Sequence, residues 1–223
     1  MKYALIGCGR IAKNHLLSAR ENNLSIQAIC DIVPERMVAH LENDTLKANG
    51  RISCYTDYKK MLEENEDIEL VSIATESGEH ARIALDCIAK GKHVIIEKPM
   101  AMSIADADRI IAEAKKKNVK VSVCHQNRFN LAVQTLRQAL EKGRFGKISH
   151  ASIHVRWNRN KDYYNQASWR GTWKEDGGAL LNQCIHGIDL LCWMLGYEME
   201  TVYGKTRRRF HDYLEAEDEI DVW

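Results

Sequence analysis

Several features that mark other classes of protein are missing from this sequence. Its 32 lysines and arginines face 31 aspartates and glutamates, so no excess charge attracts nucleic acid or an anionic membrane. No apolar run is long enough to span a bilayer. The basic run Arg207–Arg209 lacks interleaved aromatic residues, which favours a solvated strand or loop. We therefore expect neither a nucleic-acid partner nor a membrane partner.

The cysteines form no pattern that indicates a metal centre or a disulfide framework. The 7 cysteines are odd in number and scattered, and no C-x-x-C pair occurs. Met1 leads directly into a strand-like stretch, without the charged and apolar regions of a secretory leader. These features predict reduced thiols, no metal site and a cytoplasmic location.

The composition is that of a globular protein, with 45% hydrophobic and 28% charged residues. A chain of 223 residues exceeds the usual size of one domain, so we expect two domains. Residues 1–125 alternate short apolar runs with helical patterns, which predicts βαβ units and a parallel sheet. The expected strands are Tyr3–Ile6, Ile26–Cys30, Ile52–Tyr55, Leu70–Ala74, His93–Ile96 and Val119–Cys124, and Ser103 is expected to cap a helix that ends near Lys117.

The pattern changes after His125, so residues 126–223 are expected to form a second domain. Helices are expected at 131–141 and 178–195, and longer strands near 147–158 and 199–210. This order predicts an α+β domain whose sheet is mostly antiparallel. Residues 216–223 read like the start of a further strand, which predicts a domain truncated at its C-terminus. The expected fold class is α/β: an N-terminal Rossmann domain with a doubly wound parallel sheet, followed by this incomplete α+β domain.

A dinucleotide-binding fingerprint follows the first expected strand directly. The segment at 7–12 fits G-x-G-x-x-[GA] and opens a helix, so its context supports the motif. The first glycine permits a tight turn, the second lets the backbone approach a pyrophosphate, and the alanine allows close packing of helix and strand. Free amides at the helix start then receive the phosphates. The cofactor-binding candidates here are Gly7, Gly9, Arg10, Ile11 and Ala12.

Asp31 ends the second expected strand, where an acidic side chain accepts hydrogen bonds from the ribose hydroxyls of the adenosine half. Its charge repels a 2′-phosphate, so we expect NAD rather than NADP. Arg36 lies close in sequence and weakens this preference. The alternative is purely structural, a glycine turn and an aspartate that caps a helix.

Glu97-Lys98-Pro99 follows the fifth expected strand. Alone, Lys98 reads as a surface lysine. Together with the fingerprint, however, E-K-P resembles the Gfo/Idh/MocA family of oxidoreductases, which is named after glucose-fructose oxidoreductase, inositol dehydrogenase and a rhizopine-catabolism protein. The resemblance implies that Lys98 contacts the reacting hydroxyl and the nicotinamide ribose, and that Glu97 lies beside the nicotinamide.

The same resemblance extends to the loop at 74–80, which stands where the family commonly has A-T-P-x-x-x-H. It implies that Thr75 and His80 line the cofactor, although Glu76 replaces the usual proline and a solvated His80 is an equal alternative. Gln126 is a further cofactor-binding candidate on this resemblance.

Residues 177–189 match the second signature of the family, G-G-x-x-x-[DN]-x-x-x-H-x-x-D. Helical spacing places Asn182, His186 and Asp189 on one stripe. The neighbouring stripe is expected to be buried and consists of Leu181, Ile185, Ile188, Cys192 and Leu195. An imidazole suits a base that accepts the alcohol proton as hydride leaves, so His186 is the expected base and Lys98 polarises the oxygen. Asn182 stands where many members have aspartate, so it orients a hydroxyl but accepts no proton.

The segment at 163–173 supplies aromatic rings and donors. Tyr164, Trp169 and Arg170 join Lys98, Asn182 and His186 as substrate-binding candidates, because aromatic faces stack on sugars and arginine binds carboxylate or phosphate. Aromatic packing within the loop is the alternative.

Together with the helix signature, this segment is similar to the branch that oxidises the C3 hydroxyl of nucleotide-linked amino sugar uronates. We thus expect an NAD-dependent dehydrogenase that acts on a nucleotide sugar. A free sugar or a polyol such as an inositol is the alternative substrate. A non-catalytic NAD(H)-binding module is the alternative of another class. The resemblance also implies a homo-oligomer, a dimer or a tetramer, for the full-length protein.

Overall fold

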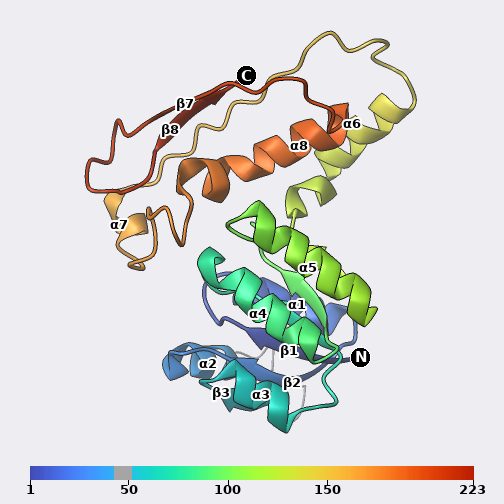
Figure 1. The fold of residues 1–223 in the computed structure, drawn as a ribbon, viewed down its shortest axis with the longest axis vertical. Helices are drawn as coiled ribbons and strands as arrows, with labels where there is room; N and C mark the ends of the chain where they lie inside the picture. Colours follow the sequence, from blue (N-terminus) through green and yellow to red (C-terminus); the bar gives the residue numbers. More distant parts are fainter. Residues whose placement is uncertain (43–51) are drawn as a thin grey trace. The chain divides into compact units, whose positions relative to one another are not determined.

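The computed structural model describes residues 1–42 and 52–223, which divide into two units, Met1–Cys124 and His125–Trp223 (Figure 1). The first unit holds a six-stranded parallel sheet, and the second holds a two-stranded antiparallel sheet. The predicted fold class, a Rossmann domain followed by an α+β domain, is confirmed. Among the helices of the described residues, none combines the length and apolar character needed to cross a membrane.

The sheet of the first unit has the strand order β3-β2-β1-β4-β5-β6, and all neighbours run parallel. The chain adds strands outward from β1 to β3 and then returns to place β4 on the other side of β1. The topological switch point therefore lies between β1 and β4. The expected strands are confirmed to within two residues at each end, with the bounds β1 (Lys2–Ile6), β2 (Ser25–Cys30), β3 (Ser53–Tyr55), β4 (Leu70–Ile73), β5 (His93–Ile96) and β6 (Val121–Val123).

Helices cover both faces of this sheet. Successive side chains of a strand point to opposite faces, and β1 shows the consequence. Tyr3 and Leu5 pack in one buried cluster with α1 and α2, whereas Ala4 and Ile6 pack in another with α3, α4 and α5. The helices of this unit are α1 (Ala12–Glu21), α2 (Pro34–Leu41), α3 (Tyr58–Glu64), η1 (Ser77–Glu79), α4 (His80–Ala89) and α5 (Ile104–Lys117). The expected cap of α5 is confirmed, since the Ser103 hydroxyl accepts the Asp106 N–H at 3.1 Å.

The second unit contains several helices and one short strand pair. Its elements are η2 (Gln126–Phe129), α6 (Leu131–Glu141), α7 (Lys161–Tyr164), η3 (Leu180–Cys184), α8 (Ile185–Leu195), β7 (Gly204–Arg207) and β8 (Glu219–Val222). The helix predicted at 131–141 is confirmed, and so is a helix that ends at Leu195. The strand expected at the C-terminal end of the sequence is confirmed as β8, which pairs with β7.

The strand predicted near 147–158 is wrong, because the structure assigns no strand there. A strand needs a neighbour that receives its backbone hydrogen bonds, and the described residues offer none to this segment. Ile153 and Val155 instead pack against α8, where a Cβ added at Gly187 would lie 3.4 Å from each side chain. The strand predicted at 199–210 shortens to Gly204–Arg207, the length over which β8 pairs with it.

The buried stripe predicted for the 178–195 helix is confirmed only in part. Its member Cys192 is buried, but Ile188 and Leu195 are 37% and 47% exposed, and His186 of the neighbouring stripe is buried. The π-helical stretch Leu180–Cys184 interrupts the α-helical spacing between Leu181 and the rest of the predicted stripe. A π turn holds more residues than an α turn, so the residues that follow it are rotated about the helix axis.

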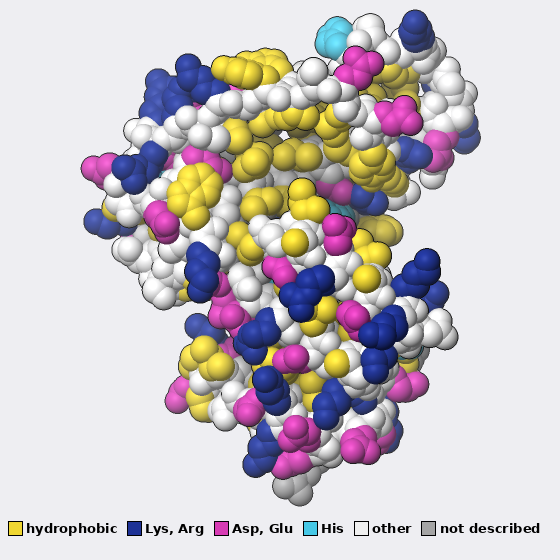
Figure 2. Space-filling model, in the orientation of Figure 1, with side chains coloured by type: hydrophobic (Ala, Val, Ile, Leu, Met, Phe, Trp, Pro, Cys, Tyr) yellow, Lys and Arg dark blue, Asp and Glu magenta, His cyan; other side chains and the backbone are white. Residues whose placement is uncertain are grey.

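Large exposed hydrophobic side chains belong mainly to the second unit. Figure 2 shows hydrophobic surface over its strands and helices, and the exposed side chains include Tyr197, Met199, Val202, Phe210 and Trp223. Extended apolar surface of this kind usually marks an interaction face.

Candidate functional site

The predicted cofactor residues of the first unit lie at one edge of the parallel sheet. Gly7 follows β1, Asp31 follows β2, Thr75 comes just after β4, and Glu97-Lys98 follows β5. Parallel strands end at the same edge, and ligands of such sheets bind outside these carboxyl ends at the switch point. The fold therefore gathers residues that are up to 91 positions apart in the sequence.

The two glycines of the fingerprint differ in what the protein itself requires. Gly7 has φ +93°, and a Cβ there would lie 2.5 Å from the carbonyl carbon and oxygen of Ala74. Gly9 faces open space, since a Cβ there would meet nothing within 4 Å. The protein's own packing forces glycine at the first position. At the second, a bound ligand would be the reason.

The start of α1 suits an anion. No side chain caps this helix, and its first turn holds no acidic residue. Ala12 is fully buried against the sheet, whereas Arg10 is exposed and Ile11 half-buried. The Ala12 and Asn14 N–H groups donate to the Gly9 and Ile11 carbonyls at 3.1 and 2.9 Å. The start of a helix carries partial positive charge, so a pyrophosphate fits the electrostatics here.

Asp31 is buried at the end of β2. Its Oδ2 accepts the Cys8 N–H at 2.7 Å, and its Oδ1 accepts the Val33 N–H at 2.8 Å. An ionised carboxylate has about four acceptor sites, so these two bonds leave capacity for ribose hydroxyls. Arg36 lies 3.6 Å from the same carboxylate. Arg36, which weakens the expected preference for NAD, is thus paired with Asp31, which supports that preference.

His80 is 1% exposed, so the alternative of a solvated His80 is wrong. Its Nδ1 lies 2.7 Å from the Pro99 carbonyl, and its Nε2 lies 3.2 Å from the Thr75 carbonyl. Burial lowers the pKa of His80 despite these two carbonyls, which favours the neutral ring. A neutral imidazole has one N–H and donates to one of these carbonyls at a time. His80 therefore ties the loop after β4 to the loop after β5.

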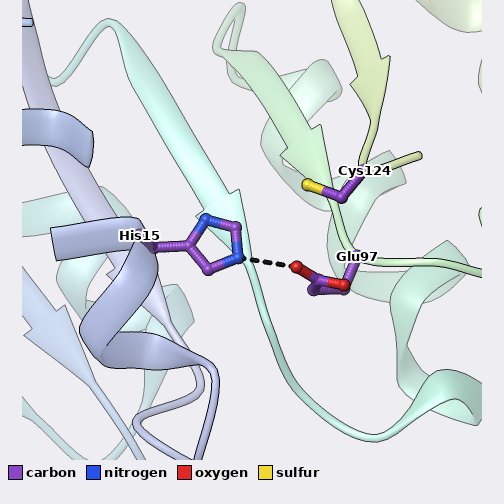
Figure 3. A group of neighbouring side chains, drawn as sticks. All are labelled: His15, Glu97 and Cys124. Carbon is purple, nitrogen blue, oxygen red and sulfur yellow. Dashed lines mark hydrogen bonds and ion pairs between the residues drawn. The ribbon is translucent and has the colours of Figure 1, made fainter. Parts of the chain in front are cut away.

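Three side chains from separate elements converge beside the E-K-P segment, as Figure 3 shows: His15 from α1, Glu97 after β5 and Cys124 after β6. His15 Nε2 lies 3.0 Å from Glu97 Oε1, and both side chains are largely buried. Burial acts to raise the pKa of Glu97, but the hydrogen bond and charge of His15, with the charge of Lys98, hold that pKa below its usual value. Glu97 is therefore a fixed, ionised carboxylate.

These three side chains are also the group within the described residues that could bind a metal ion, since their ligand atoms lie within 4.8 Å of one another. A cysteine binds metal as the thiolate. Burial and the neighbouring Glu97 carboxylate raise the pKa of the Cys124 thiol to about 12, which opposes that form. We interpret the group as a polar network that fixes Glu97.

The lowered pKa of Glu97 predicts a pH-dependent contribution to stability. The ionised carboxylate stabilises the folded state at pH values above its unfolded pKa of about 4.3, and this contribution is lost as the pH falls through the lower folded pKa. Glu97→Gln should thus lower Tm at neutral pH, by roughly 2–4 °C for each kcal/mol lost. The difference from the parent should shrink as the pH falls below about 4.

Thermal unfolding of parent and variant across this pH range checks the expectation. Glu113→Gln is the matched control, because Glu113 is a solvent-facing member of an α5 ion pair. A Tm difference for Glu97→Gln that stays constant with pH would contradict the assigned charge.

In the second unit, one helical segment presents the residues of the second signature. Asn182 lies within the π-helical stretch Leu180–Cys184, and π turns recur at functional sites. Its amide donates to the buried carboxylate of Asp176. His186 lies in the first turn of α8 and is 9% exposed, with its ring centroid 6.5 Å from that of Trp157.

Asp189, the acid that ends the signature, serves as an anchor within the second unit. Arg128 donates to it through Nε at 2.8 Å and through Nη2, and His125 Nδ1 lies 3.5 Å away. The hydrogen bond to Asp189 raises the pKa of Arg128. Asp189 therefore ties α8 to η2, the element that the exposed Gln126 begins.

The substrate candidates of the aromatic segment pack on one another. The Tyr164 ring contacts the rings of Tyr163, His211 and Tyr213, and burial raises the pKa of Tyr164 to about 12. Arg170 stacks on Trp169, with its guanidinium 4.6 Å from a ring centroid. Such contacts agree with the aromatic-packing alternative, and they also hold the side chains in fixed positions.

Sequence reasoning missed His15, Cys124, Asp176 and Arg159. A signal was available for two of them. His15 lies three positions after Ala12, one turn along α1 from the fingerprint, and Asp176 directly precedes the Gly177-Gly178 pair. Cys124 read as an ordinary buried thiol, and Arg159 stands outside both signatures.

Two family models match the chain. Residues 1–125 match an oxidoreductase family described as having an NAD-binding Rossmann fold, and residues 133–223 match the GFO/IDH/MocA C-terminal domain. The chain therefore belongs to the Gfo/Idh/MocA family of oxidoreductases. This confirms the resemblance that the E-K-P segment and the fingerprint predicted, and it confirms NAD as the cofactor class.

Three individual relatives represent two kinds of dehydrogenase. Inositol 2-dehydrogenase of Salmonella typhimurium is 30% identical over 206 residues, which are 91% of this chain and 56% of that protein. The WlbA dehydrogenase of Chromobacterium violaceum, solved with NADH and UDP-GlcNAcA, is 36% identical with a TM-score of 0.90, over 100% of this chain and 62% of that one. WlbA of Bordetella pertussis, solved with the same molecules, is 35% identical with a TM-score of 0.89, over 99% and 65%. This chain thus spans less than two thirds of these relatives' lengths.

Proposed function

We propose that this chain is part of an NAD-dependent dehydrogenase that oxidises a sugar hydroxyl, with residues 1–125 binding NAD and residues 126–223 binding the sugar. The observation that carries the proposal is the edge of the parallel sheet. Three strands of one Rossmann sheet, β1, β2 and β5, end at this edge and are followed by Gly7, Asp31 and Lys98. In the family's cofactor chemistry, residues in this order serve the pyrophosphate, the ribose and the reacting hydroxyl.

The residues at this edge fit NAD. Gly9 leaves room for a close ligand, the start of α1 offers partial positive charge without a capping side chain, and Asp31 keeps acceptor capacity for ribose hydroxyls. The negative charge of Asp31 favours NAD over NADP. Thr75, Glu97 and Gln126 are proposed to contact the cofactor, and His80 to hold the Thr75 loop in place.

When bound, NAD supplies the hydride acceptor. We assign Lys98 to the substrate oxygen, where an ammonium group stabilises developing negative charge. Glu97, fixed by His15, sets the position of the segment that carries Lys98. His186 accepts the hydroxyl proton as general base, because imidazole changes protonation near neutral pH. Asn182 orients a hydroxyl without taking a proton.

The proposed substrate is a nucleotide-linked amino sugar uronate oxidised at C3. The similarity to the two WlbA dehydrogenases, 36% and 35% identical and solved with UDP-GlcNAcA, supports it. Tyr164, Trp169 and Arg170 are the side chains proposed to contact it. A free polyol is the second candidate, which the 30% identity to an inositol 2-dehydrogenase supports.

Initial rates of NADH formation test the proposal. We expect the full-length protein to oxidise UDP-N-acetylglucosaminuronate with NAD, and to oxidise myo-inositol at least about 10-fold less efficiently in kcat/KM, a difference of about 1.4 kcal/mol. Faster oxidation of myo-inositol would favour the polyol. NADH binding without oxidation of either compound would favour a non-catalytic NAD(H)-binding module.

A further inference from the structure

Two arginines of the second unit contact the ring of one buried tyrosine. The guanidinium carbon of Arg170 lies 4.3 Å from the Tyr163 ring centroid, and that of Arg159 lies 4.9 Å from it. Each arginine also stacks on a tryptophan, Arg170 on Trp169 at 4.6 Å and Arg159 on Trp157 at 5.6 Å. Aromatic faces attract cations and hold them in place, so two positive charges are fixed close together.

Within the described residues, no carboxylate forms an ion pair with Arg159 or Arg170, and the Nε atom of each is buried without a hydrogen-bond partner. Other arginines of the same unit do contact carboxylates, namely Arg128, Arg137, Arg207 and Arg209. Arginine cannot lose its charge in a protein, and a poorly solvated charge without a counterion is costly. The pair therefore favours an anion.

One buried acid, Asp176, lies close to this cluster. Its Oδ2 accepts the Gly171 N–H at 2.8 Å, and its Oδ1 accepts the amide of Asn182, which also lies near the Tyr163 hydroxyl. This single carboxylate leaves the two arginines with a positive local balance.

The arginine pair is joined to the helix that carries the second signature. Tyr163 Oη accepts from Arg170 Nη1 at 2.6 Å and from Gln183 Nε2 at 3.2 Å, and Arg159 Nη2 donates to Gln183 Oε1 at 3.1 Å. Asn182 Nδ2 lies 3.4 Å from the same tyrosine oxygen. An anion bound by the arginines would thus be held at a fixed offset from Asn182 and His186.

We propose that Arg159 and Arg170, stacked on Tyr163, form the site that binds an anionic oxygen group of the substrate, either the uronate carboxylate or the nucleotide diphosphate. This inference rests on the proposed function and deepens it. Planar guanidinium groups bind both kinds of anion through paired N–H donors. The proposal thereby adds Arg159 to Arg170 as a substrate-binding residue, and Arg159 lies outside both signatures of the family.

The test uses Arg159→Met and Arg170→Met, which keep much of the side-chain volume and remove the charge. We expect either change to weaken calorimetric binding of UDP-N-acetylglucosaminuronate about 10- to 100-fold, the range for a lost charged hydrogen bond, and to leave NADH binding unchanged. Arg→Lys at each position keeps the charge without the planar fork and should give a smaller loss. Arg137→Met is the matched control, because Arg137 also stacks on an aromatic ring but already pairs with Glu141.

Neutral UDP-N-acetylglucosamine separates the two sources of the anion. A loss confined to the uronate assigns the site to the carboxylate, and an equal loss for both ligands assigns it to the diphosphate. The proposal is overturned if the parent binds neither ligand, if both methionine variants bind them like the parent, or if Arg137→Met loses as much. Calorimetry needs no turnover, so an inactive parent that still binds the uronate through these arginines would refute the proposed oxidation and keep the anion site.

Discussion

His186→Ala is expected to lower kcat for sugar oxidation by about 10²- to 10⁴-fold, the range lost when a positioned acid–base group is removed. His186 is not among the proposed cofactor contacts, so binding of NADH should stay at the parent's level. His186 is 9% exposed and lies beside Trp157, so truncation also removes packing. His186→Gln keeps most of the volume and cannot act as a base, and it should lose as much activity.

The measurements are initial rates with saturating NAD, NADH binding by fluorescence, and rescue by added imidazole. Rescue of His186→Ala is the readout that a structural role would not produce, because free imidazole replaces the lost base and not the lost packing. His154→Ala serves as control, since His154 is an exposed histidine of the same unit. Lys98→Met should show a comparable loss in kcat without rescue by imidazole. Full turnover by folded His186→Gln would refute the assignment of the base.

The surroundings of Asn182 suit an asparagine rather than the aspartate that many family members have. The Asn182 amide donates to Asp176, a buried carboxylate that also accepts the Gly171 N–H. An aspartate at position 182 would place two carboxylates in contact, and one would take up a proton or move away. Asn182 and Asp176 therefore fit each other, and His186 remains the proposed base.

The cofactor edge could be predicted from the sequence because its determinants are local. A strand, two glycines and a helix start lie within a dozen residues, and period-2 apolar runs place the later strands. The partner of Glu97 could not be predicted in this way. His15 is 82 positions away in the sequence, and only the parallel order of β1, β4 and β5 brings α1 to the E-K-P segment.

The second unit was harder to predict, for two physical reasons. Alternation at 147–158 signals a strand, but a strand also needs a neighbour to pair with, and sequence periodicity does not report one. The 178–195 helix follows an α-helical period in the sequence, whereas the backbone adopts a π turn at Leu180–Cys184 that shifts the residues before it relative to those after it. The arginine pair on Tyr163 depends on a fold-back of the aromatic segment that no spacing rule anticipates.

Gly7→Ala is expected to lower the stability of the fold, whereas Gly9→Ala is expected to weaken NADH binding. At Gly7 an alanine must hold φ +93° and place its Cβ 2.5 Å from the Ala74 backbone. Strain at a positive φ and overpacking each cost about 1–3 kcal/mol, so the free energy of unfolding should fall by roughly 2–6 kcal/mol. At Gly9 the added methyl group meets no protein atom within 4 Å. Stability should stay within about 0.5 kcal/mol of the parent.

NADH binding distinguishes the two roles. Because the Gly9 backbone is where a pyrophosphate would approach, a methyl group there should weaken NADH binding about 10-fold or more in a protein that melts like the parent. Urea unfolding and fluorescence titration of each variant measure the two quantities separately. Gly143→Ala is a suitable control, since Gly143 has φ +67° with no atom near a Cβ and lies outside the first unit, so it reports the cost of φ alone. If Gly9→Ala unfolded at a lower urea concentration than the parent and bound NADH normally, the glycine would be required for stability and not for cofactor binding.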